Sequence, residues 1–416
     1  QQSEEDKIIE EVVVQASRLK GSASAVIDER KNQAFVADIL GADQISRTGD
    51  GDAAAALRRV TGLTLVDGKF IYVRGLGERY SSTQLNGATV PSPDPTRTVI
   101  PLDLFPAEII ESLSVQKSFS PSMPASFGGG NVDIRLKTIP SDFVLTVSSS
   151  IGGNSENFDD GIGYTGGDND WYGKDDGTRG MSPVLASFWD NRVFLNDISS
   201  EQNRQVAADL NRDVDVKSKS IGPDVSLDFA IGDSYETGDF RFGFLATTAY
   251  DNGWDVAEQY EGQDFRKVEG GWELVRGFDH VTSTEHSVKW SGMLNFGVEY
   301  DKNHRIDLST LILHDTRDEL KDKLGNTNNV LLSDGLKVRD VEVIYEEREL
   351  ISNQIKGMHT FPELNFLGFD WKYSSARSNR YAPGNVETRF ILADANDDGV
   401  FDINTESSLR RGRTAS

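Results

Sequence analysis

The segment from Asp394 to Glu406 holds the clearest group of side chains that could bind a metal ion. Its sequence, DANDDGVFDINTE, places oxygen donors at the first, third and fifth positions and glycine at the sixth. Calcium accepts irregular cages of oxygen ligands, and this spacing is similar to the first half of a calcium loop. Glu406 comes one residue after the position where the loop's closing glutamate belongs, so an acidic solvated loop is the alternative. The candidate ligands are Asp394, Asn396, Asp398, the carbonyl of Val400, Asp402 and Glu406.

Groups that could carry out catalysis are not found at any comparable spacing. The five histidines lie far apart, no nucleophile motif accompanies them, and cysteine is absent. His280 and His286 are candidates for haem or metal ligands, although exposed loop histidines are usually ordinary polar surface. We therefore predict no enzyme and no required cofactor, with Ca²⁺ as the one ion that the sequence suggests.

Charge and hydropathy narrow the class of protein. The net charge of -24 argues against nucleic acid as a partner, because contact with phosphates needs a basic face. No apolar run approaches the length of a membrane helix. Membrane barrels escape such a search, because their strands alternate between lipid-facing and lumen-facing residues. A soluble β-rich protein and a membrane barrel both remain open at this point.

The elements that position these residues follow two different patterns along the chain. Before Pro140 the predicted elements are short: a helix over Ala53–Arg59, a strand over Phe70–Val73, a tight turn within Leu85–Thr89 and a short helix from Pro106. After Pro140, apolar residues alternate with small or polar ones in seven runs, which predicts strands with one apolar face. The runs begin near Phe143, Val225, Phe240, Val288, Ile306, Val341 and Leu367.

The connections between these runs alternate in length. Long polar links, such as Gly152–Gly222, Asp251–Ser287 and Thr316–Arg339, take turns with short ones, such as Asp301–His304. This regular alternation is typical of a bacterial outer-membrane barrel, which has short turns on one side and long loops on the other. A sandwich of two sheets does not require it.

The N-terminal stretch EEVVVQA raises a separate question. It places three strand-forming valines in a polar arm, and so short a strand is not stable alone. The segment either forms a strand of its own domain or adds to the sheet edge of another protein, where main-chain hydrogen bonds supply the affinity. The residues concerned are Glu10, Glu11, Val12, Val13, Val14, Gln15 and Ala16.

Together these motifs resemble the TonB-dependent outer-membrane receptors, whose N-terminal plug domain sits inside a barrel of about 22 strands. EEVVVQA is similar to the family's TonB box, with Gln15 where threonine is usual. The other matching motifs, in chain order, are VRG at Val73–Gly75, LNG at Leu85–Gly87, IESLSVQK at Ile110–Lys117 and FGGGNVDIRLK at Phe127–Lys137. The resemblance implies an arm over residues 1–29, a mixed α/β plug domain over 30–139 and antiparallel strands of a transmembrane β-barrel over 140–416.

The resemblance also implies a function and its partners. We expect energy-dependent import of a scarce nutrient, such as a ferric siderophore, across the bacterial outer membrane, with TonB pairing to residues 10–16. Arg74 and Arg135 are candidates for holding the plug against acids of the barrel, such as Glu299, because guanidinium pairs bidentately with carboxylate. Hydrogen bonds within the plug alone are the alternative for both arginines.

About seven strands are too few to close around a plug, so we expect the chain to be the first part of a receptor. A binding or assembly platform for a surface partner protein, built on the same scaffold without import, is the rival function. A soluble secreted β-protein is a third reading. The substrate itself cannot be read from these residues.

Overall fold

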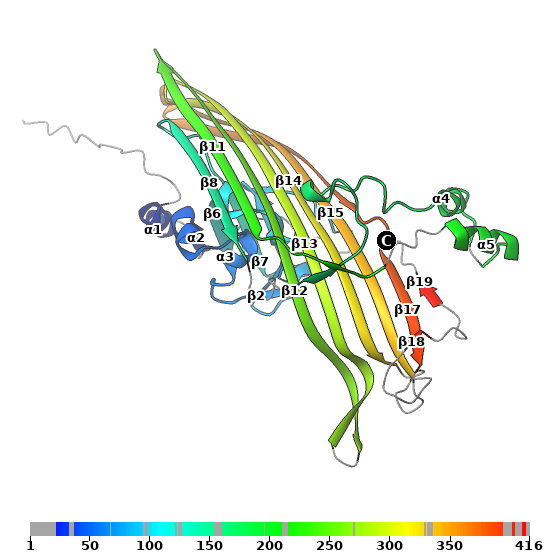
Figure 1. Ribbon diagram of the computed structural model, residues 1–416. Helices are drawn as coiled ribbons and strands as arrows, with labels where there is room; N and C mark the ends of the chain where they lie inside the picture. The colour runs from blue at the N-terminus through cyan, green and yellow to red at the C-terminus, as the bar shows by residue number, and fades with distance from the viewer. Residues whose placement is uncertain are drawn as a thin grey trace, which may run out of the picture.

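The computed structural model places an N-terminal domain against one face of a long antiparallel sheet (Figure 1). Its described residues are 22–32, 37–66, 68–94, 97, 100–120, 123, 127–153, 160–194, 196–209, 215–268, 271–327, 330, 336–393, 402–403 and 410–412.

The N-terminal domain is built on a five-stranded sheet in the order β1-β6-β7-β4-β5, in which β4 and β7 are parallel. Its helices are α1 (Ala23–Asn32), α2 (Ala42–Thr48), α3 (Ala53–Leu57) and the 3₁₀ turns η1 (Glu78–Tyr80), η2 (Leu102–Leu104) and η3 (Ala107–Ile109). Its strands are β1 (Ala37–Gly41), β2 (Leu63–Val66), β3 (Phe70–Val73), β4 (Ser81–Leu85), β5 (Ala88–Thr89), β6 (Ile110–Gln116) and β7 (Gly130–Leu136).

Local chemistry explains most of these elements. Helix α3 begins where the Asp52 carboxylate accepts a hydrogen bond from the Ala55 amide at 2.8 Å, as an N-cap residue does. The predicted hairpin turn is present, with Asn86 and Gly87 both at positive φ (50° and 74°). The helix expected from Pro106 is only one 3₁₀ turn, because the backbone from Ile110 onward pairs with β7 instead.

The three glycines of the FGGGNVDIRLK motif serve close packing rather than a sharp bend. None of Gly128, Gly129 and Gly130 has a positive φ. A β-carbon on Gly130 would lie 2.4 Å from a methyl of Val73, and one on Gly129 would lie 2.5 Å from Leu76. The strand β7 therefore needs glycine at its start to reach β3.

The long sheet contains the seven predicted strands. They are β8 (Val144–Gly152), β11 (Asp224–Thr237), β12 (Phe240–Val268), β13 (Gly271–Tyr300), β14 (His304–Asn326), β15 (Leu336–Phe361) and a last strand in two parts, β16 (Leu367–Tyr381) and β17 (Val386–Ala393). Both parts pair with β15, and two short strands, β18 (Asp402–Ile403) and β19 (Arg410–Gly412), pair with β17. Among the strands that the structure describes the sheet is not closed, because β8 pairs with β11 and with no second strand.

Two of the links expected to be long loops are largely strand. The pairing of β12 with β13 runs from Phe240 and Tyr300 to Val268 and Gly271, and so includes the described part of the predicted link Asp251–Ser287. The link Thr316–Arg339 is likewise strand at both its ends. In these parts both faces carry polar residues, so the alternation that marks a half-buried strand ends while the backbone pairing continues.

The connection between β8 and β11 is the long link with a fold of its own. It contains β9 (Gly161–Gly163), the 3₁₀ turn η5 (Asp170–Tyr172), α4 (Pro183–Asp190), α5 (Ser200–Asp209) and β10 (Lys217–Lys219), which pairs with β9. Pro183 in the first turn and Ser182, whose hydroxyl accepts from the Leu185 amide at 3.4 Å, begin α4. We call residues 160–182 the first-loop segment.

One apolar core joins the N-terminal domain to the sheet. Five buried side chains of the sheet belong to the same cluster as the apolar residues of the domain: Leu245, Met293, Leu311, Leu313 and Leu350. Burying side chains of this kind stabilises by roughly 1.5–3 kcal/mol each. Along the described residues, no helix is long and apolar enough to span a membrane.

Candidate functional site on both faces of the sheet

A buried ion cluster joins the N-terminal domain to the sheet at the level of η2. Arg348 of β15 donates to the Asp103 carboxylate of η2 at 2.8 and 3.3 Å and to Asp315 of β14. Arg348 and Asp315 are 5% and 3% exposed, and Asp103 is 8% exposed. A charge so far from water needs an opposite charge beside it. The cluster therefore holds the domain on the sheet only while Arg348 remains paired with both Asp103 and Asp315.

Further cations and acids surround this cluster. Lys69 lies 3.7 Å from Asp103, and Lys289 of β13 donates to the Asp103 carbonyl at 3.5 Å. Burial acts to raise the pKa of Asp103, but the charge of Arg348 outweighs it, and the net pKa is lowered. Burial raises the pKa of Asp52, because Lys289 at 4.0 Å is too distant to offset it. Arg348 thus keeps Asp103 ionised at the interface.

The Asn86-Gly87 turn makes a second polar contact with the same face. The Asn86 amide donates to Gln354 of β15 at 3.2 Å, and the Gln354 amide donates to the Leu85 carbonyl at 2.9 Å. Lys372 of β16 donates to the Asn86 carbonyl. The hairpin thereby presents main-chain acceptors to two strands of the sheet.

Glu108 of η3 is an acid at this interface whose pKa is raised. Burial, together with the nearby carboxylates of Asp228 and Asp251, raises its pKa to about 7 against the effect of Lys137. The group is therefore protonated at mildly acidic pH and becomes charged near neutrality in a site that disfavours the charge.

We expect a pH dependence from Glu108. Its pKa is raised from 4.5 to about 7, so the stability that its protonated form provides is present at pH 5 and is lost as the pH rises to 7 and above. Glu108→Gln should keep that stability at pH 8 and flatten the curve. Thermal unfolding of both proteins between pH 5 and 8 measures this, and parallel curves would contradict it.

The first-loop segment packs on the opposite face of the same strands. Neighbouring residues on a strand point to opposite faces, and while Lys289 reaches the N-terminal domain, the Trp290 indole donates to the Tyr172 carbonyl at 3.2 Å. In the same way Asp315 binds Arg348, while Thr316 donates to the Gly173 carbonyl at 2.6 Å. The sheet thus carries the domain on one face and the segment on the other (Figure 1).

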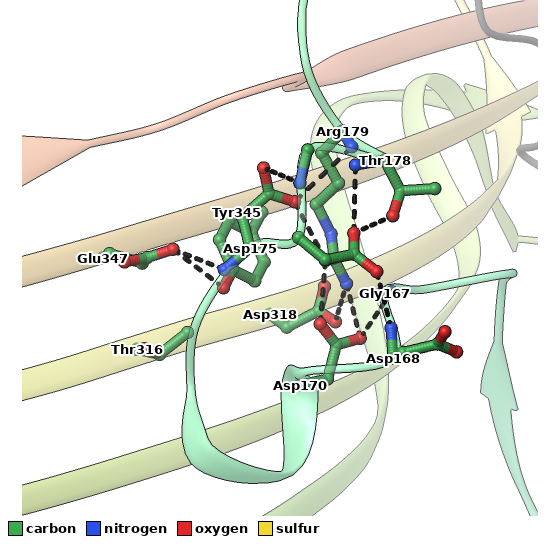
Figure 2. Close-up of polar contacts among 12 residues, drawn as sticks. Gly167, Asp168, Asp170, Asp175, Thr178, Arg179, Thr316, Asp318, Tyr345 and Glu347 are labelled. Atoms are coloured by element: carbon green, nitrogen blue, oxygen red, sulfur yellow. Dashed lines mark hydrogen bonds and ion pairs between the residues drawn. The ribbon is translucent and has the colours of Figure 1, made fainter.

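Arg179 is the centre of that segment, as Figure 2 shows. Its guanidinium donates to both oxygens of Asp170 at 2.8 and 2.7 Å and to Asp318 of β14 at 3.0 Å. Its Nε donates to the Tyr164 hydroxyl at 2.7 Å, and its guanidinium carbon Cζ lies 4.1 Å from the ring centroid of Tyr345. With 6% of its surface exposed, Arg179 ties the segment to two strands.

The groups around Arg179 complete a closed polar network. Tyr164 donates to Asp318 at 2.6 Å, and burial, reinforced by that carboxylate, raises the Tyr164 pKa. The Asp175 amide donates to Glu347 of β15 at 2.7 Å, and Lys174 lies 3.4 Å from the same carboxylate. Such a network fixes one arrangement of the segment on the sheet.

A cavity of about 370 Å³ lies beside this network, between the first-loop segment and β12–β14. His286 lies in it, stacked on Trp254 with ring centroids 3.9 Å apart, and Lys219 covers the Trp254 ring at 4.5 Å. His280 contacts Thr282 at 3.2 Å instead. No group of three or more His, Cys, Asp or Glu suited to a metal occurs among the residues that the structure describes.

Below the first-loop segment, the same face exposes a belt of large apolar side chains. We call these residues the apolar belt: Leu227, Phe229, Phe240, Phe242, Phe244, Leu294, Phe296, Ile306, Leu308, Phe369 and Tyr373. They lie toward the short turns, and the segment contacts the strands at Trp290, His314 and Glu347, farther from those turns. The face therefore changes from apolar to polar along each strand.

A protein-family comparison decides what the N-terminal domain is. Residues 29–132 match the model of the TonB-dependent receptor plug domain. The chain carries a TonB-dependent receptor plug. The buried cluster around Arg348 is accordingly a contact between the plug and the long sheet, and the antiparallel strands of that sheet resemble part of a receptor barrel. The predicted family and fold class are confirmed.

Comparison with solved structures matches the chain to several receptors and transporters, three of which follow. A mutant ferric enterobactin receptor from Pseudomonas aeruginosa is 12% identical, with 89% of this chain and 56% of that chain covered and a TM-score of 0.31. The unliganded ferric citrate transporter FecA is 10% identical, with 89% of this chain and 62% of that chain covered and a TM-score of 0.28. The pyoverdine-bound FpvA of P. aeruginosa is 11% identical, with 91% of this chain and 48% of that chain covered and a TM-score of 0.39. The chain thus spans roughly half to six-tenths of their length. A comparison with curated proteins found no match.

Two of the predicted sites lie outside the described residues. The TonB box, residues 10–16, is one of them. The calcium ligands are the other: Asp394, Asn396, Asp398, Val400 and Glu406 are not described, and for Asp402 only its place in β18 is known. Both stay predictions.

The structure places the three residues chosen for plug and barrel contact apart from one another. Arg135 pairs with Glu29 of α1 at 2.5 Å and with Asp133 at 3.2 Å, both within the plug, as the alternative reading expects. Glu299 lies 4.0 Å from Arg305 of the next barrel strand. Arg74 is exposed, with its amide bonded to the Gly62 carbonyl at 2.8 Å.

The residues that do join plug and sheet were missed in the sequence. Asp103 stands inside the apolar run PLDLF, and Arg348 and Asp315 stand in strands on the face opposite to the apolar belt. Burying a charged side chain within an apolar run is costly unless it is paired, so Asp103 in PLDLF predicts a buried ion pair. This rule singles out Asp103 without naming its partner.

Proposed function

We propose that this chain is the plug and first barrel part of a receptor that imports a large, scarce ligand through the bacterial outer membrane, with energy supplied by TonB. The observation that carries the proposal is the two-sided sheet. One face binds a plug through a buried ion cluster, and the other exposes the apolar belt. A soluble protein rarely exposes so continuous an apolar surface, whereas a barrel in lipid requires one.

The stretch of β13 between Trp290, at the edge of the first-loop segment, and Tyr300, at the short turn, has the height of a membrane and contains the belt residues Leu294 and Phe296. From Trp290 to Tyr300 the strand β13 rises about 3.3 Å per residue, or about 33 Å in all. At the tilt of about 40° that barrel strands adopt, this corresponds to about 25 Å along the membrane normal, the height of an outer-membrane apolar band. Aromatic residues at the two ends, Trp290 and Tyr300, fit the girdles of such a band. The plug elements then face the periplasm through the short turns.

The role proposed for residues 10–16 is to pair with TonB as an added strand. Main-chain hydrogen bonds then provide the affinity, so a side chain that keeps the N–H and extended backbone is tolerated. The substrate class stays open between siderophores and other large ligands, because the belt and the plug contact serve any of them. Import requires residues 10–16 to bind TonB, whereas a surface platform does not, so a test of this binding separates the two functions.

The test is a pair of substitutions at Val13. Val13→Pro removes a main-chain donor and should weaken binding of the full-length receptor to the purified periplasmic domain of TonB at least about tenfold. Val13→Thr, the matched control, keeps the donor and should bind within about twofold of the unchanged protein. Biolayer interferometry measures both, and equal affinities for the two variants would remove the arm from the mechanism and favour the platform.

A further inference from the structure

A cavity of about 430 Å³ lies between the plug and the sheet near the short turns. The Asn86-Gly87 turn and the end of β7 form one wall, and β14, β15 and β16 form the other. Five cationic side chains line it, namely Arg135, Lys137, Arg305, Lys356 and Lys372, against three acidic ones, Glu111, Asp133 and Asp307. We call it the lysine cavity.

Two of the lysines stand directly opposite each other. Lys356 of β15 and Lys372 of β16 are cross-strand partners in the antiparallel register, and both line the cavity. Side chains at such positions have β-carbons about 5 Å apart, and like charges there destabilise the sheet. A sheet that keeps this pair gains if an anion lies between the two ammonium groups.

The acids that line the cavity have other partners, and Glu111 accepts from the Thr138 hydroxyl at 3.5 Å. Asp307 is the partner of Lys356 on its other side, but the Arg305 Nε lies 2.9 Å from both its oxygens. Asp133 accepts from Arg135 at 3.2 Å and from the Gly87 amide at 2.7 Å. Among the residues that the structure describes, neither Lys356 nor Lys372 forms an ion pair, although Lys372 donates to the Asn86 carbonyl.

The plug contributes a third cation to the same space. Lys137 follows β7, and its carbonyl accepts from Asn295 of β13 at 2.7 Å, which fixes the backbone beside the cavity. Within the described part of the chain its ammonium group forms no ion pair. The three lysines thus come from both walls.

We propose that the lysine cavity binds a small anion with at least two carboxylate or phosphate groups, which bridges plug and sheet. Each ammonium group can donate a charge-assisted hydrogen bond to such a group, and the cavity volume is within the range of small-molecule sites. The anion would stabilise the docked plug by mass action. This site goes beyond the proposed import function and does not depend on TonB.

Pyrophosphate is the probe, titrated into the full-length chain in detergent by isothermal titration calorimetry. The unchanged protein should bind it, and Lys356→Gln and Lys372→Gln should each raise the Kd at least about tenfold, or about 1.4 kcal/mol. Lys337→Gln, which removes a partly buried lysine outside the cavity that pairs with Asp279 at 3.1 Å, is the control and should not change the Kd. Absence of binding at millimolar pyrophosphate, or an equal Kd in all variants, would overturn the site.

A second measurement separates an anion site from a structural role of Lys356. Without pyrophosphate, Lys356→Gln should raise the Tm or leave it unchanged, because the substitution removes the repulsion between Lys356 and Lys372. With pyrophosphate, the Tm should rise in the unchanged protein and not in the variant. A lower Tm without the anion, together with an unchanged response to pyrophosphate, would show that Lys356 only supports the sheet.

Discussion

Arg348→Met is expected to weaken the attachment of the plug to the sheet by about 3–5 kcal/mol. The substitution removes the cation shared by Asp103 and Asp315, and both carboxylates stay buried with their charges uncompensated. Hydrogen exchange of the amides at residues 100–110 measures the local opening of the plug. That exchange should become faster by at least about a hundredfold, which corresponds to about 2.7 kcal/mol, just under the lower end of this range.

Arg339→Met is the matched control. It lies on the same strand and also loses an ion pair, with Asp322 at 2.7 Å, but its side chain is 36% exposed. Pairs this accessible contribute about 0–1 kcal/mol, so the exchange of the plug should change little. If both variants behaved alike, burial would not be what makes the Arg348 cluster strong.

A triple variant tests the same cluster from the other side. Arg348→Met combined with Asp103→Leu and Asp315→Leu replaces all three buried charges by apolar side chains of moderate size. Because Lys69 and Lys289 still lose the acid beside them, this protein should be more stable than Arg348→Met but less stable than the unchanged one. Exchange of the amides at residues 100–110 should accordingly lie between the rates of those two proteins.

The second large effect is expected from Arg179→Ala. It leaves Asp170 and Asp318 without their common cation and removes the donor to Tyr164, on the face of the sheet opposite to the plug. Breaking a buried pair in this way costs about 3–5 kcal/mol. Exchange of the amides at residues 160–180 should therefore become fast, while that of the plug stays slow.

The controls for Arg179 lie in the same loop. Arg204→Ala removes a pair with Glu201 whose side chains are 72% and 65% exposed, and we expect no change from it. Arg179→Lys keeps the charge but loses the two-pronged contact with Asp170, so its protection should be intermediate. Slow exchange at residues 160–180 in Arg179→Ala would mean that the Gly173 carbonyl contacts alone hold the segment.

Several features of the fold could be predicted because they depend on local rules. The alternating residues of β11 to β16 gave the strands and their apolar face, since a strand with one face in an apolar environment must alternate. The Asn86-Gly87 turn follows from the positive φ that these two residues tolerate. The plug motifs predicted the family, which the match over residues 29–132 confirms.

The strand ends could not be predicted in the same way. Beyond the apolar belt, β12 and β13 carry polar residues on both faces, and only pairing of one backbone with the other keeps them extended. That pairing joins residues far apart in the chain and leaves no periodic signal. The polar link Asp251–Ser287, which the sequence predicts as a loop, is therefore part of the paired strands β12 and β13.

By itself the sequence determined where the strands with one apolar face lie and which of their faces is apolar, because those properties follow from the side chains of each segment alone. Only the tertiary structure decided the partners. Arg135 pairs within the plug, whereas Arg348 reaches Asp103 across a separation of 245 residues, and Arg179 reaches Asp318 on the opposite face of the sheet. The choice depends on register and burial, since a buried charge must find whichever opposite charge the folded chain brings within reach.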